Sequence, residues 1–169
     1  MRWDERQHRR EAQRKEIREA ISAGHSARGT ADRILSELES ADNWNTWDIL
    51  GGGGVITHMA KHGHLDEAQN MVSQLQSQLR RFKTELADIQ ISAAMQVNVD
   101  GFLRFADYFF DGLFADWAVG NRISQSHSSV SSTRSQISRT LDKLKEMEKA
   151  ADQEIANLKA ELDDLTIKA

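Results

Sequence analysis

Apolar residues recur every seven positions along the last third of the chain, which is the repeat of a coiled-coil helix. This repeat predicts one helix over residues 122–169, about 70 Å long at 1.5 Å per residue. The complementary a-type column is less regular because three of its positions are polar, so its first part is expected to need other partners. The repeat comprises Ile123, Val130, Ile137, Leu144, Ala151, Leu158 and Leu165, and the a-type column comprises His127, Arg134, Leu141, Glu148, Ile155 and Leu162. We interpret Ile137, Leu144, Leu158 and Leu165 as packing or interaction residues.

A weaker repeat in residues 1–41 predicts a second coiled-coil helix. Its members follow steps of three, four or seven and are Ile17, Ile21, Gly24, Ala31, Leu35 and Leu38. Residues 1–19 hold seven Lys/Arg against five Asp/Glu, whereas residues 150–169 hold two against five. Because opposite local charges favour placing these two ends together, we predict that the first and last helices form an antiparallel coiled-coil arm.

Residues 42–121 differ in composition and predict a compact helical core inserted between the two arm helices. Apolar residues from Leu65 to Ala93 follow alternating steps of three and four, which indicates a long amphipathic helix. A shorter helix, capped by Asp42 or Asn43 and ended by Gly63, is expected before it. An aromatic-rich helix over 102–118 is expected after it. The predicted fold is therefore all-α, an elongated helical bundle in which the three segments form one continuous unit.

Four consecutive glycines occupy positions 51–54. They do not form a phosphate-binding P-loop, because no Gly-Lys-Ser/Thr follows them and no strand is predicted before them. A backbone nest for an anion stays open as an alternative. We favour close packing, in which Gly52 and Gly53 let a neighbouring helix approach, at a cost of about 1 kcal/mol each relative to alanine.

Three histidines follow the glycines and form the candidate metal site. His58 and His62 are four residues apart on a predicted helix, a spacing that places two imidazoles on one side, and His64 lies close by. Asp107 and Asp111 form a second pair with the same spacing that could complete a divalent metal site, for instance for zinc. The alternative is structural: the histidines cap helices and the aspartates form buried salt bridges. The chain contains no His-Glu-x-x-His motif, which would supply a general base.

The amino-acid composition and net charge limit the classes of protein to which this chain can belong. The chain has 169 residues, no proline and no cysteine, so long helices are unbroken and disulfides are excluded, as is typical of a reducing compartment. The formal net charge of −4 gives no reason to expect nucleic acid as a partner. No apolar run approaches the ~20 residues of a membrane span, and the charged N-terminus lacks a signal peptide. We therefore expect a cytoplasmic protein.

The stretches WDILGGG, HLDEA and FLRFADYFFDGLFADW resemble the central region of a group of uncharacterised bacterial α-helical coiled-coil proteins. The resemblance covers roughly residues 42–121. It implies a bacterial origin and a helical core, and because the group has no assigned activity it implies no functional residue.

Two functions follow from these patterns. The first is a non-enzymatic structural or scaffold protein without a cofactor, which self-associates as a homo-oligomer or binds helices of another protein. The alternative is a metal-dependent helical-bundle hydrolase that uses the cluster of His58, His62 and His64. We favour the interaction protein, with no catalytic residues.

Overall fold

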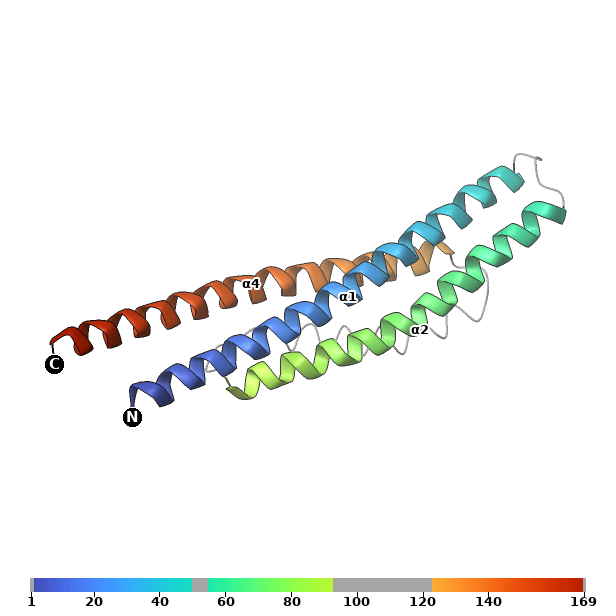
Figure 1. Ribbon diagram of the computed structural model, residues 1–169. Helices are drawn as coiled ribbons and strands as arrows, with labels where there is room; N and C mark the ends of the chain where they lie inside the picture. The colour runs from blue at the N-terminus through green and yellow to red at the C-terminus, as the bar shows by residue number, and fades with distance from the viewer. Residues whose placement is uncertain (1, 50–54, 93–122, 169) are drawn as a thin grey trace.

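The structure is a computed structural model that describes residues 2–49, 55–92 and 123–168, with side chains over 2–37, 39–40, 70–89 and 127–168. The helices are α1 (Trp3–Ile49), α2 (Val55–Ser92) and α4 (Ile123–Lys168) (Figure 1). No strand occurs within these described ranges, so the predicted all-α class is confirmed there.

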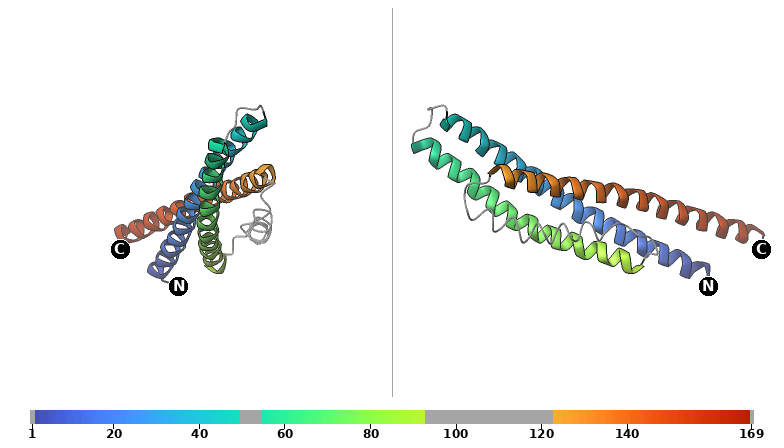
Figure 2. Two further views of the ribbon diagram at one scale, coloured as in Figure 1. Left: turned by 90° about the vertical axis from the view of Figure 1, so that its right-hand side faces the viewer. Right: turned by 180° about the vertical axis from the view of Figure 1, so that it is seen from behind.

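The helix α1 is the central element of the described bundle. Both α2 and α4 pack along it, and among the described residues the backbones of α2 and α4 do not contact each other. Both neighbours run in the opposite direction to α1, and the two chain ends lie at the same end of the elongated molecule (Figures 1 and 2). One helix must therefore supply two packing surfaces.

The apolar face of α2 follows the predicted steps of three and four. Its fully or almost fully buried residues are Val72, Leu75, Leu79, Phe82, Leu86 and Ile89. The helix begins earlier than expected and passes through Gly63 without ending, so the predicted helix end at Gly63 is wrong. A glycine in a helix interior costs only about 1 kcal/mol relative to alanine, which is too little to end a long helix by itself. Similarly, α1 continues beyond residue 41 to Ile49.

Small residues form most of the buried surface of α1. The core includes Ala20, Ala23, Ala27 and Ala31, together with the larger Ile17 and Ile34. The predicted seam residues Ile21 and Leu35 pack at its margin and are only partly buried. These alanines lie on one stripe of α1, because steps of three and four residues keep them on the same side of a helix. Small side chains on this stripe leave room for the neighbouring helices to pack against α1.

The predicted a-type column of α4 is buried only in part. Leu141 is 0% exposed and Ile155 is 3% exposed, whereas the side chains of Arg134 and Glu148 are 46% and 27% exposed. Thr133, Thr140 and Met147, each one position before a member of this column, are buried as well. The buried face is therefore wider than predicted, and the apolar repeat does not mark the two threonines because they are polar.

Both buried threonines satisfy their hydroxyls within α4. Thr133 Oγ1 donates to the carbonyl oxygen of Ser129 at 2.9 Å, and Thr140 Oγ1 donates to that of Gln136, also at 2.9 Å. This bond to the preceding turn lets threonine enter the core without an unpaired polar atom.

The predicted packing residues of α4 divide by position along the helix. Ile137 and Leu144 are fully buried, and Leu158 is half-buried. Leu165 is 49% exposed. The core therefore thins toward the C-terminal end of α4.

None of the described helices combines the length and apolar content needed to cross a membrane.

Candidate functional site

A series of charged pairs joins α1 to α4 along their interface. Arg10 Nε lies 2.7 Å from Glu154 Oε2, Arg14 Nη1 lies 3.1 Å from Asp152 Oδ1, and Arg18 Nε lies 2.6 Å from Glu148 Oε1. Further along, Asp32 pairs with Arg134, and Glu39 Oε1 lies 3.4 Å from His127 Nε2. The residue numbers rise along α1 as they fall along α4. We call these pairs the α1–α4 ladder.

The α1–α4 ladder explains the three polar residues that interrupt the a-type column. His127, Arg134 and Glu148 each pair with a residue of α1 at the edge of the core. The expectation that they need other partners is thus met by side chains of α1. The hydrogen bond to Glu148 also raises the pKa of the Arg18 guanidinium above its usual value.

The ladder specifies register more than it adds stability. Its side chains are partly exposed, and such pairs contribute about 0–1 kcal/mol each. By comparison, burying one leucine or phenylalanine contributes about 1.5–3 kcal/mol. The core therefore supplies most of the packing energy, and the ladder selects one alignment of α1 on α4.

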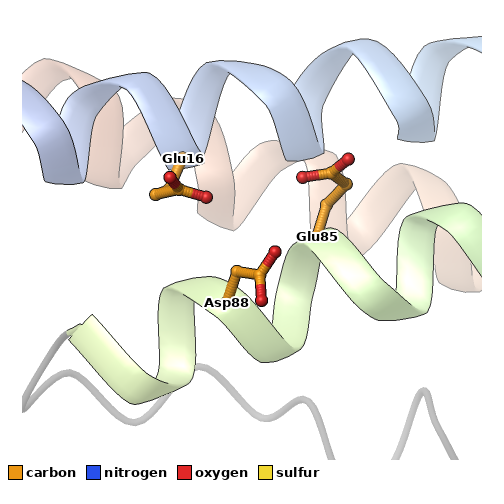
Figure 3. Close-up of side chains that lie close together, drawn as sticks. All are labelled: Glu16, Glu85 and Asp88. Atoms are coloured by element: carbon orange, nitrogen blue, oxygen red, sulfur yellow. The ribbon is translucent and has the colours of Figure 1, made fainter.

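A second polar cluster lies between α1 and α2. Glu16 of α1 and Glu85 and Asp88 of α2 point toward one another across the gap between the helices (Figure 3), and one carboxylate oxygen of each lies within 4.8 Å of the others. Carboxylate oxygens are the ligands of hard cations. Such groupings are also common on protein surfaces without an ion, and we assign no ligand to this acidic cluster.

The acidic cluster changes the ionisation of Glu85. Burial raises the pKa of this carboxyl above 4.5, and the charges of Glu19, Asp88 and Glu16 raise it further. Arg81 Nε, 3.8 Å from Glu85 Oε1, opposes the shift. At neutral pH the cluster therefore brings like charges together and weakens the α1–α2 contact.

Replacing Glu85 with glutamine is expected to stabilise the protein at pH 7. The folded protein binds the Glu85 proton more tightly than the unfolded chain does, so protonation adds stability as pH falls through the raised pKa toward 4.5. Above the raised pKa this contribution is lost. Melting temperatures of the wild type and Glu85→Gln at pH 7 and 4.5 check this: the variant should melt higher at pH 7, with the difference shrinking at pH 4.5. The exposed Glu146→Gln serves as the control, and a Glu85→Gln protein no more stable than wild type at pH 7 would contradict the prediction.

A basic group lies on the α4 side of α1. Arg28 Nη2 is 3.2 Å from His25 Nδ1. Burial lowers the pKa of His25 below 6.5, and the positive charges of Arg28 and Lys145 lower it further. These effects favour the neutral form of the His25 imidazole.

The candidate metal residues lie outside the part of the molecule whose side chains are described. His58, His62 and His64 fall within α2, but their side chains are not among the described ones. Asp107, Asp111, Gly52 and Gly53 lie outside the described residues altogether. The histidine metal site and the packing role of the glycines both stay predictions.

Local sequence patterns do not identify the acidic cluster or most of the ladder partners. A weak signal existed, since Glu16 and Glu85 each directly precede a buried apolar residue, Ile17 and Leu86. Which flanking carboxylates meet depends on the alignment of α1 with α2, and no local pattern encodes that alignment.

No known protein family, curated protein or solved structure matches this chain. Its function must therefore be argued from its own residues.

Proposed function

We propose that this protein is a non-enzymatic coiled-coil interaction protein that associates with itself through helical surfaces. In this proposal α1 and α4 form an antiparallel coiled-coil arm, and α1 acts as the spine on which the other helices pack. In this proposal the functional surfaces are the long faces of the helices, and the alignment of α1 with α4 fixes how these faces are presented.

The α1–α4 ladder is the observation that carries the proposal. Its members are spaced along both helices from Arg10 to Glu39 and from His127 to Glu154. Charged residues flanking an apolar seam set partner choice and orientation in coiled coils. A long interface with charges at its margin is the arrangement of a helix-pairing module.

The apolar pattern of α4 supports the same function. Val130, Ile137 and Leu144 are fully buried against the bundle. The same seven-residue repeat continues through Leu158 and Leu165, where burial is incomplete. A seam that extends beyond its intramolecular partners is suited to pairing with a further helix.

Sedimentation velocity of the wild-type protein over a wide concentration range tests this function. We expect a concentration-dependent shift from a 19.1 kDa monomer to a larger species, because the exposed part of the seam becomes paired on association. A monomer at every concentration would overturn the proposal. Metal analysis of the same untagged protein adds a second readout, since stoichiometric zinc would favour the hydrolase alternative instead.

A further inference from the structure

We propose that the end of the bundle where α1 begins and α4 ends docks on the same end of a second copy of the chain. This inference rests on the proposed self-association and names the surface that performs it. We call this surface the open end and define it as residues 2–10 of α1 and 158–168 of α4.

The apolar seam of α4 continues without interruption into the open end. Ile155 is 3% exposed, whereas Leu165, further along the same side of the helix, is 49% exposed. Leu158 and Leu162, between them, are half-buried. Burial therefore falls along one unbroken apolar stripe, although the spacing of the stripe does not change.

The arrangement of the helices explains this loss of burial. The C-terminal end of α4 extends past the first turn of α1, and α2 ends well before that point (Figures 1 and 2). The last turns of α4 therefore project beyond both of the other described helices. The apolar residues of those turns lack the neighbouring helix that α4 has along the centre of the bundle.

Charge on the open end is self-complementary. On α1, Arg2 and Arg9 are exposed, and on α4, Glu161 is exposed beside the apolar stripe. Among the described residues none of these three takes part in an ion pair, in contrast to the ladder residues further along. A two-fold contact uses the same patch on both copies, so the basic start of one α1 can face the acidic end of the other α4.

The remaining carboxylates at the start of α1 do not oppose this contact strongly. Asp4 and Glu5 lie in the first helical turn, where negative charge is already stabilised by the helix dipole. The contact is short, because the seam offers few apolar positions in the open end. We therefore expect a weak dimer, with a dissociation constant in the micromolar range, as for small interfaces.

The test compares Leu165→Asp with Ala156→Asp by sedimentation velocity. Both side chains are exposed, but residue 156 lies outside the open end and on the opposite side of the helix from residue 165, at 100° per residue. Leu165→Asp places a charge in the proposed contact and should weaken dimerisation on the order of ten-fold or more. Ala156→Asp adds the same charge and should leave dimerisation unchanged.

Single cysteines give an independent readout, because the chain contains no cysteine of its own. Leu165→Cys should form a disulfide-linked dimer under mild oxidation, whereas Ala156→Cys should stay monomeric under denaturing electrophoresis. A wild-type dimer that Leu165→Asp does not weaken would overturn the open end as the site and leave self-association intact. A wild-type protein that is monomeric throughout would overturn both.

Discussion

Replacing Phe82 with alanine is expected to lower the free energy of unfolding by about 3–5 kcal/mol, the usual cost of deleting a fully buried aromatic side chain. Phe82 is 0% exposed and is the largest fully buried side chain among the described residues. Its ring faces Gly24 of α1, which also faces Leu141 of α4. The substitution therefore leaves a cavity at the point where three helices meet. Gly24, which faces this cavity, has no side chain that could fill it.

Urea unfolding followed by circular dichroism measures this loss. Because small domains are stable by only about 5–15 kcal/mol in total, the variant should unfold at a much lower urea concentration. Phe82→Leu keeps part of the volume and should cost less, and the exposed Thr84→Ala on the same helix should change little. A Phe82→Ala protein with a wild-type midpoint would show that this junction is not closely packed.

The long helices were largely predictable from the sequence. In α2 the steps from Val72 to Ile89 alternate between three and four residues, and the residues so marked are the ones buried in the fold. Large apolar residues at strict helical spacing identify a helix and its buried face together. The absence of proline allowed the helices to run on, and they extend further than the predicted boundaries at residue 41 and Gly63.

The packing within the bundle was less predictable, because many of its buried residues are small or polar and do not stand out in a hydrophobic repeat. Ala20, Ala23 and Ala27 are buried in α1, although alanine is also frequent on exposed helix surfaces. Thr133 and Thr140 occupy core positions because their hydroxyls bond to the preceding turn. A hydrophobic repeat cannot separate these cases from solvated positions, since the difference lies in the neighbouring helix.

The residues of the candidate site were harder still to predict, because their pairing depends on how the helices are aligned with one another in the fold. The sequence marked Arg134 and Glu148 as irregular seam positions, but not their partners Asp32 and Arg18. Each partner is one of many charged residues along α1, and only the alignment of α1 with α4 selects it. The acidic cluster has the same origin on the α2 side.

Replacing Gly24 with alanine is expected to be destabilising relative to the same change at Gly29. A Cβ atom at position 24 would lie 2.7 Å from Leu141 Cδ2 and 2.9 Å from Phe82 Cζ. At position 29 it would meet nothing within 4 Å. Both glycines lie inside α1, so alanine gains helix propensity of about 1 kcal/mol at either position. The difference between the two variants therefore isolates the steric cost at Gly24, about 1–3 kcal/mol for overpacking a core.

The neighbours of Gly24 cannot relieve this crowding by moving into solvent, because both Phe82 and Leu141 are 0% exposed. The urea midpoint of Gly29→Ala should lie at or above that of the wild type. The urea midpoint of Gly24→Ala should lie below that of Gly29→Ala. A third variant identifies the cause: Leu141→Ala removes the nearest clashing atom, so Gly24→Ala should cost less in that background, by a coupling energy of about 0.5–3 kcal/mol. If Gly24→Ala were instead as stabilising as Gly29→Ala, α1 would not approach α2 and α4 closely at this junction.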